Sequence, residues 1–219
     1  MNISKIKGLK YPDEYFIRFF YKKKLHQSEK LSILELGCSN GNNLMLASSY
    51  CHDVIGVDLD KNLISNAMEN YKLSKFSNFY NFYHMDMMKY CQLNRDVNSE
   101  VLVLANSVYY ISKNHFIELL RNIKNNYIIK KNSLIFLRFR NLNDYRNGFG
   151  ERIDEASFIL NTNDENGLLC QFYDNETMLN ILIKELNLRN FETMNINYDN
   201  IQNNEKFSCC DTVIWGQIN

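Results

Sequence analysis

The stretch Glu35-Leu36-Gly37-Cys38-Ser39-Asn40-Gly41 joins an apolar run of strand length to a segment with helical patterning. Glycine permits backbone geometry and a close ligand approach that a Cβ would block. The backbone N–H groups at the start of the helix would then point at whatever lies above the end of the strand. By itself, the turn is compatible both with a nucleotide site and with a tight structural connection.

A carboxylate follows at the distance that a nucleotide site requires. Asp58 closes the second apolar run, Val54-Ile55-Gly56-Val57-Asp58, about 20 residues beyond the turn. An acidic side chain at this point can accept hydrogen bonds from both hydroxyls of a ribose. The pair of features therefore favours a nucleotide-containing ligand.

Strand-like and helix-like patterns alternate along the chain. The expected strands are 32–36, 53–58, 79–84, 100–106 and 133–139, and the expected helices between them are 41–50, 61–73 and 114–127. This alternation predicts a parallel sheet with helices on both faces. A segment at 168–173, a helix at about 174–187 and two strands at 191–198 and 209–218 are expected to close the sheet.

The length of 219 residues and the apolar fraction of 45% predict one α/β domain over residues 1–219. Phenylalanine and tyrosine at helical spacing within 11–25 predict an amphipathic helix, so residues 1–30 form an N-terminal helical cap. Residues 141–173 are expected to form a lid insertion on the acceptor side. Asparagine-rich stretches such as 195–204 are expected to be loops.

Charge and cysteine usage exclude several classes of protein. Basic and acidic residues number 25 each, so no global field attracts nucleic acid or an anionic membrane. No stretch approaches the roughly 20 apolar residues that span a bilayer, and a cytoplasmic protein is expected. The six cysteines are expected to be buried reduced thiols, and the four histidines lack metal-ligand spacing, so no metal is predicted. The oligomeric state is not indicated.

The turn, Asp58 and the order of elements resemble the class I S-adenosylmethionine-dependent methyltransferases, in particular a bacterial small-molecule subgroup. The usual turn of that family is Glu/Asp-x-Gly-x-Gly-x-Gly, and Ser39 replaces its middle glycine. The resemblance covers nearly the whole chain. It implies S-adenosylmethionine as cofactor and a Rossmann-like methyltransferase fold, with a mostly parallel seven-stranded sheet, an antiparallel last strand and helices on both faces.

The same resemblance implies roles for further residues along the chain. Asp86 would accept from the adenine amino group, while Met85 and Met87 either flank the ring or fill the core. Tyr11 lies in a segment that covers the methionine end of the cofactor, and Arg18 either pairs with the methionine carboxylate or is solvated. The expected cofactor-binding residues are Tyr11, Arg18, Glu35, Gly37, Ser39, Asn40, Gly41, Asp58, Leu59, Met85, Asp86, Met87, Asn106 and Ser107.

The acceptor site is less clearly defined. His84, His115 and Tyr110 are candidate general bases, because each is expected near the carboxyl end of a strand. The residues Arg138, Arg140, Asp144, Arg146, Gly148, Gly150, Glu151 and Arg152 resemble a pattern of the same subgroup. Either their guanidinium groups bind an anionic acceptor, or they pair with Asp144, Glu151, Asp154 and Glu155 as a charged lid. The expected catalytic residues are His84, Tyr110, Arg140 and Arg146.

The predicted function is methyl transfer from S-adenosylmethionine to a small, anionic acceptor, such as a phosphate-like or sugar-linked precursor of a cell-surface polysaccharide. Two alternatives stay open. A nicotinamide-dependent oxidoreductase would use a similar turn, although GxGxxG is missing and the chain is short for a separate substrate domain. A non-catalytic cofactor-binding or scaffold subunit is suggested by Ser39 and by the lack of an evident catalytic residue at Asn106-Ser107, where the family places its fourth motif beside the methyl group.

Overall fold

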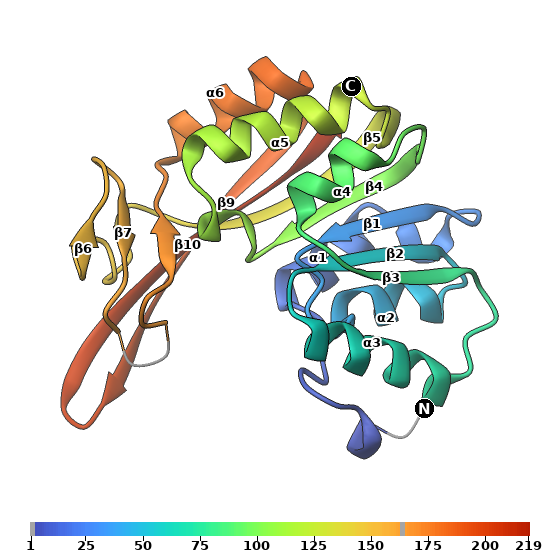
Figure 1. Ribbon diagram of the computed structural model, residues 1–219, viewed down its shortest axis with the longest axis horizontal. Helices are drawn as coiled ribbons and strands as arrows, with labels where there is room; N and C mark the ends of the chain where they lie inside the picture. The colour runs from blue at the N-terminus through green and yellow to red at the C-terminus, as the bar shows by residue number, and fades with distance from the viewer. Residues whose placement is uncertain (1–2, 163–164) are drawn as a thin grey trace.

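A seven-stranded sheet forms the centre of the computed structural model, which describes residues 3–162 and 165–219 (Figure 1). The sheet has the order β3-β2-β1-β4-β5-β10-β9. Its strands are β1 (Ser32–Leu36), β2 (Asp53–Asp58), β3 (Tyr80–His84), β4 (Ser99–Ala105), β5 (Ile129–Arg140), β9 (Arg189–Gln202) and β10 (Glu205–Ile218). The first five are parallel, and the last strand, β10, is antiparallel to both of its neighbours. The predicted Rossmann-like methyltransferase sheet is confirmed.

In the described part of the chain, six α-helices cover the two faces of the sheet, α1 to α3 on one face and α4 to α6 on the other (Figure 1). They are α1 (Glu14–Lys22), α2 (Asn42–Ser49), α3 (Lys61–Ser74), α4 (Met87–Leu93), α5 (Lys113–Asn125) and α6 (Asn175–Leu186). Short 3₁₀ turns are η1 (Ile3–Lys5), η2 (Leu25–Gln27) and η3 (Val108–Tyr110). The five helices that periodicity predicts are present. Helix α4 was not predicted, and it starts at Met87, directly after Asp86, whose side chain caps it.

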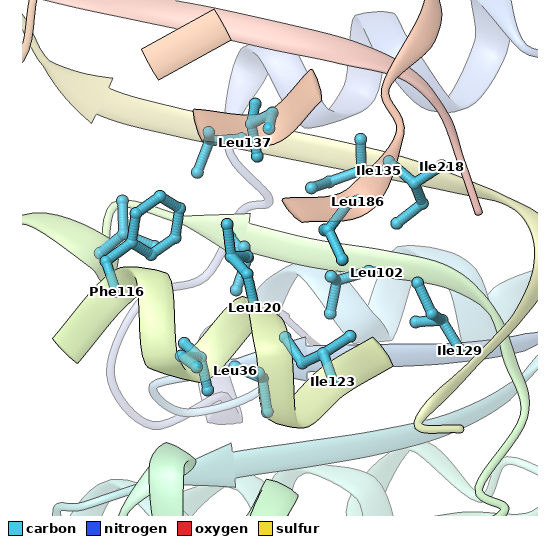
Figure 2. Packing of buried hydrophobic residues seen from close by; sticks show 14 of the residues in the cluster. Leu36, Leu102, Phe116, Leu120, Ile123, Ile129, Ile135, Leu137, Leu186 and Ile218 are labelled. Atoms are coloured by element: carbon cyan, nitrogen blue, oxygen red, sulfur yellow. The ribbon is translucent and has the colours of Figure 1, made fainter. Parts of the chain in front are cut away.

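Each face of the sheet has its own buried core. Figure 2 shows Leu36 and Leu102 of the sheet packing under Leu120 and Ile123 of α5 and beside Leu186 of α6. On the other face, Phe16 and Phe19 of α1 lie against Phe136 of β5, with both ring centroids 5.5 Å from it. The aromatic spacing in 11–25 therefore does form a buried helix face, and residues before β1 are fixed to the sheet.

Strands β9 and β10 form a hairpin that projects beyond the helices (red in Figure 1). The prediction that 195–204 is a loop is wrong, because most of it belongs to β9 and pairs with β10. Only Asn203 and Asn204 make the turn, with φ of 50° and 67°, a conformation that asparagine tolerates better than most residues. The side chain of Ile196 is buried, which explains why this asparagine-rich segment can pair as a strand.

The segment after β5 contains a small antiparallel sheet. Its strands are β6 (Glu151–Arg152), β7 (Ser157–Ile159) and β8 (Leu169–Gln171). Buried Phe158 and Phe172 pack here in one cluster with Tyr109 of η3. The insertion therefore lies against the segment that follows β4.

No helix within residues 3–162 and 165–219 has the length and hydropathy to cross a membrane. All six cysteines are free thiols, and five of them are buried as predicted. Cys51 differs, because it lies exposed just after α2.

Candidate active site

A cavity of about 920 Å³ opens at the carboxyl ends of the parallel strands. Its wall is made by the turn after β1, the end of β2, the segment after β3 and the segment after β4. Residues before α1 and residues of the insertion complete it. Open α/β sheets bind ligands at this end of the strands.

Gly37 brings the turn after β1 close to the segment after β4. Its φ is +81°, and an added Cβ would lie only 2.3 Å from Cβ of Ser107. Both Gly37 and Ser107 line the cavity. The close approach explains why glycine is needed at the first position of the turn.

Ser39 replaces a glycine of the usual turn and adopts its conformation. Its φ is +50°, in the left-handed region, and its backbone N–H donates to Oδ2 of Asp58 at 2.7 Å. Oδ1 of Asp58 accepts from the N–H of Asp60 at 2.9 Å. Two backbone donors thus fix the Asp58 carboxylate in the cavity wall, and each oxygen keeps a lone pair for a ligand hydroxyl.

Glu35 is buried, with 1% of its surface exposed, yet it lines the cavity. Oε1 accepts from Nδ2 of Asn43 at 2.6 Å, and Oε2 has no partner among the described residues. Burial raises the pKa of Glu35 to about 8, and the charges of Asp13 and Asp58 act in the same direction. An unpartnered buried oxygen in a cavity wall fits a ligand that brings a hydrogen-bond donor or a positive charge.

The segment after β3 also reaches the cavity. Asp86 lines it while Oδ1 accepts from the N–H of Lys89 at 3.0 Å, so helix capping fixes this carboxylate. Met85 and Met87 line the cavity and also pack against the core under α5. Both predicted roles of the two methionines are therefore compatible with their position.

Residues 7–13, here called the N-terminal strap, cross the cavity and supply Leu9, Tyr11, Pro12 and Asp13 to its wall. Asparagine side chains bind the backbone of the strap. Nδ2 of Asn40 donates to the carbonyls of Lys7 and Leu9, each at 2.8 Å, and Nδ2 of Asn42 donates to that of Tyr11 at 2.9 Å. The N–H of Asp13 donates to Asn43 at 2.7 Å, and Asn70 binds both backbone groups of Lys7.

Three of the predicted cofactor residues lie outside the cavity wall. Asn40 is fully buried because it holds the strap, and Gly41, with φ of +75°, packs on Phe82 and Tyr71. Arg18 is exposed and stacks on Tyr15, with Cζ 4.9 Å from the ring centroid. Its exposure agrees with the solvated alternative. The other eleven predicted cofactor residues all line the cavity.

Arg140 is buried beside the cavity and does not line it. Nη2 donates to Oε1 of Glu165 at 2.6 Å, and Cζ lies 4.3 Å from the ring centroid of Tyr109. The hydroxyl of Tyr110 donates to the same oxygen of Glu165 at 2.7 Å. Glu165 therefore links the insertion to η3, and nothing in the local sequence pointed to it.

The neighbouring arginines are paired with carboxylates as well. Nη1 of Arg146 donates to Asp144 at 2.8 Å, and Nε lies 3.0 Å from Oε2 of Glu165 in an ion pair without hydrogen-bond geometry. Arg138 binds Asp13 and Asp211. The arginines near the insertion thus form ion pairs, as in the charged-lid alternative, although the partner Glu165 was not foreseen.

The structure separates the four predicted catalytic residues. Tyr110 lines the cavity, whereas Arg140 and Arg146 lie behind it and His84 is exposed at the end of β3. His115 is likewise exposed, in the first turn of α5. Among the described residues no histidine, lysine or arginine lines the cavity; its acidic lining residues are Asp13, Glu35, Asp58, Asp60 and Asp86. Strand-end position alone thus misplaced both histidines.

The wall that η3 and the insertion contribute is apolar or aromatic. It consists of Tyr109, Tyr110, Ile111, Leu168 and Leu169, here called the apolar wall. Burial raises the pKa of Tyr110, and the hydrogen bond to Glu165 acts in the same direction, so its hydroxyl stays protonated at neutral pH.

Comparison with known proteins agrees with this geometry. Residues 33–126, from β1 to the end of α5, match a family described as a methyltransferase domain. No curated protein sequence matches the chain. Solved structures of similar fold include an S-adenosylmethionine-dependent methyltransferase from Methanosarcina mazei, with 15% identity, a TM-score of 0.68, and coverage of 88% of this chain and 95% of that chain.

Two further structures share the fold. One is an S-adenosylmethionine-dependent methyltransferase from Archaeoglobus fulgidus, with 16% identity, a TM-score of 0.61, and coverage of 94% of this chain and all of that chain. The other is 1,6-didemethyltoxoflavin-N1-methyltransferase from Burkholderia thailandensis, solved with 1,6-didemethyltoxoflavin and S-adenosylhomocysteine. It has 10% identity, a TM-score of 0.61, and coverage of 94% of this chain and 80% of that chain.

The sheet order and the site at its carboxyl edge define the class I methyltransferase fold. Residues 33–126 match the methyltransferase-domain family, and the chain has the fold of S-adenosylmethionine-dependent methyltransferases, which supports the predicted activity and cofactor. The match favours this prediction over a nicotinamide-dependent oxidoreductase.

Proposed function

We propose that the enzyme methylates a small, neutral acceptor with an apolar or aromatic body, in the cytoplasm. The observation that carries this proposal is the composition of the cavity wall, which pairs carboxylates with the apolar wall and has no basic side chain among its described residues. An anionic acceptor would meet several carboxylates there, and like charges in a region of low dielectric repel each other strongly. A neutral acceptor would instead bury its apolar surface against Tyr109, Leu168 and Leu169.

We further propose that the carboxylates divide the cofactor among them. Asp58, held by two backbone N–H groups, accepts from the ribose hydroxyls, and Asp86 accepts from the adenine amino group. Glu35 has a free oxygen for a donor at the amino-acid end, and Tyr11 of the strap covers that end. When bound, S-adenosylmethionine supplies an electrophilic methyl group.

The chain contributes to catalysis mainly by positioning. The apolar wall excludes water and orients the acceptor, and such orientation can supply a large part of a barrier reduction. Tyr110 donates its own proton to Glu165, which leaves its oxygen free to accept an N–H or O–H of the acceptor. The lone pair of that acceptor atom would then be held in a fixed direction. Because the pKa of Tyr110 is raised, the tyrosine orients the acceptor and does not remove its proton.

An anionic acceptor, including a phosphate-like or sugar-linked precursor of a cell-surface polysaccharide, is the second candidate. It is favoured by Arg140, which stacks on Tyr109 directly behind the apolar wall. In this case Arg140 or Arg146 would have to leave Glu165 and turn toward the acceptor. Loss of affinity for an anionic acceptor in Arg140→Ala or Arg146→Ala, with folding intact, would support this candidate.

A radiolabelled-methyl transfer assay tests the proposal. The full chain is incubated with S-adenosylmethionine and two panels of acceptors, neutral phenols and heteroaromatic amines in one, sugar phosphates and other anions in the other. We expect product from the neutral panel and a loss of about tenfold or more in kcat/KM in Tyr110→Ala. Tyr127→Ala, at an exposed tyrosine far from the cavity wall, is the matched control. Transfer to the anionic panel alone would overturn the proposal.

A further inference from the structure

Glu35 is the only buried carboxylate among the described lining residues of the cavity, and one of its two oxygens lacks a hydrogen-bond partner. Its Oε1 accepts from Asn43, whereas Oε2 meets no donor within residues 3–162 and 165–219. A carboxylate in this position is costly to ionise unless a donor or a cation reaches the bare oxygen. Without a ligand, burial and the unpartnered oxygen therefore favour the neutral form of the Glu35 carboxyl group.

The groups around Glu35 do not compensate a negative charge. Asp13 from the strap and Asp58 from β2 both add to the rise in its pKa caused by burial. On the turn and on α3, Cys38 and Tyr71 have pKa values raised by burial, and the charge of Glu35 raises them further. Asn43 of α2 is the donor that acts in the opposite direction. The nearby guanidinium of Arg138 is shared between Asp13 and Asp211.

The cofactor carries a positively charged hydrogen-bond donor of the kind that Oε2 of Glu35 lacks. S-adenosylmethionine carries a sulfonium and an ammonium, and only the ammonium has N–H donors. S-adenosylhomocysteine keeps the ammonium and lacks the sulfonium charge. An ammonium beside Oε2 would satisfy the bare oxygen and favour the ionised carboxylate.

We infer that cofactor binding is coupled to the release of one proton from Glu35, which is a neutral carboxyl group in the free enzyme and a carboxylate beside the cofactor's ammonium. Only the O–H bond breaks, and the proton passes to solvent. The inference rests on the proposed cofactor site and is independent of the acceptor.

The coupling makes affinity depend on pH with a defined sign. The pKa of about 8 places Glu35 in its protonated form at pH 7, so ionisation must accompany binding. Affinity should then rise by up to about tenfold for each pH unit between pH 6 and pH 8 and level off above that.

Isothermal titration calorimetry with S-adenosylhomocysteine tests the inference in buffers of different ionisation enthalpy at pH 7. The dependence of the observed enthalpy on buffer enthalpy gives the number of protons released. We expect about one for the wild type and none for Glu35→Gln. 5′-Methylthioadenosine, which lacks the ammonium, is the ligand control and should release none. Asp86→Asn is the protein control and should bind more weakly yet still release about one proton.

The outcomes separate the inference from the cofactor site. Binding of S-adenosylhomocysteine without proton release in the wild type overturns the coupling and leaves the site intact. Failure of the wild type to bind the compound overturns both. A full proton released by Glu35→Gln would show that another group is the source. Should Glu35→Gln not fold, the wild type still decides, because a dissociation constant that does not change between pH 6 and pH 8 contradicts the inference.

Discussion

Nη1 of Arg138 lies 2.6 Å from Oδ2 of Asp13, an ion pair that ties β5 to the end of the N-terminal strap. Nε of the same arginine donates to Asp211 of β10 at 2.9 Å. Burial by itself would lower the pKa of Arg138, but the charges of Asp13 and Asp211 outweigh it and raise the pKa. One guanidinium thus compensates two partly buried carboxylates, one of which lines the cavity.

Arg138→Met should therefore lower both stability and cofactor affinity. Removing the cation leaves the carboxylates of Asp13 and Asp211 without a compensating positive charge, at a cost of about 3–5 kcal/mol in the free energy of unfolding. Chemical denaturation and titration with S-adenosylhomocysteine measure the two effects. Arg121→Met, which breaks an exposed ion pair with Glu185, is the control and should leave both unchanged. Equal effects of the two substitutions would contradict the role given to Arg138.

Gly37→Ala should weaken cofactor binding by more than the strain of an alanine in the left-handed region would explain. Gly37 and Gly167 have nearly the same φ, +81° and +80°, so an alanine at either position costs about 1–2 kcal/mol in the left-handed region. Only at Gly37 would the new Cβ also meet Ser107, since no described residue lies within 4 Å of a Cβ at Gly167. Comparing unfolding free energies and S-adenosylhomocysteine affinities of the two variants isolates this clash. Similar affinities in both variants would refute the close-approach argument.

Glu35→Gln should remove part of the pH dependence of stability. An unfolded glutamate has a pKa of about 4.3, and the folded value of about 8 is higher. Between these values the folded chain binds the extra proton, so stability falls as pH rises, by at most about 1.4 kcal/mol per pH unit. Melting temperatures from pH 5 to pH 8 should therefore fall more steeply for the wild type than for Glu35→Gln. Glu118→Gln, at an exposed position on α5, should follow the wild type.

Glu165→Ala should loosen the insertion over the apolar wall. The substitution leaves Arg140 without its carboxylate partner and frees the hydroxyl of Tyr110. Hydrogen–deuterium exchange in peptides covering 165–171 should accelerate about tenfold or more, since loss of a buried pair costs several kcal/mol. Glu155→Ala, an exposed glutamate of the same insertion, should exchange like the wild type. Unchanged exchange in Glu165→Ala would show that the insertion is held by its apolar cluster alone.

The fold was predictable because its signals are local. Periodicity located all seven strands of the main sheet, and the resemblance to the methyltransferase family implied the antiparallel last strand. The sequence did not predict helix α4, because seven residues are too few to show a helical period. It did not predict strands β6 to β8 for the same reason, since they have only two or three residues each.

Site residues were predictable where the backbone of a strand-turn-helix unit fixes their positions. Gly37, Ser39 and Asp58 lie within one strand-turn-helix unit and its neighbour, so their spacing alone indicated their proximity. Glu165 binds Arg140 and Tyr110, which lie 25 and 55 residues away in the sequence. Asn42 binds the backbone of Tyr11, 31 residues away. No local sequence pattern marks such distant pairs. His84 was misplaced because topology gives the end of a strand but not the direction of its last side chain.

The N-terminal strap is held by its main chain, so its position does not depend on the side chains that line the cavity. The asparagines donate to the main-chain carbonyls of Lys7, Leu9 and Tyr11, which every residue type has, while Leu9 and Tyr11 line the cavity. Substitutions at these two positions would keep the strap in place and change what it presents to a ligand. The strap is thus a natural place for a mutant library, and it precedes residues 33–126, which match the methyltransferase-domain family.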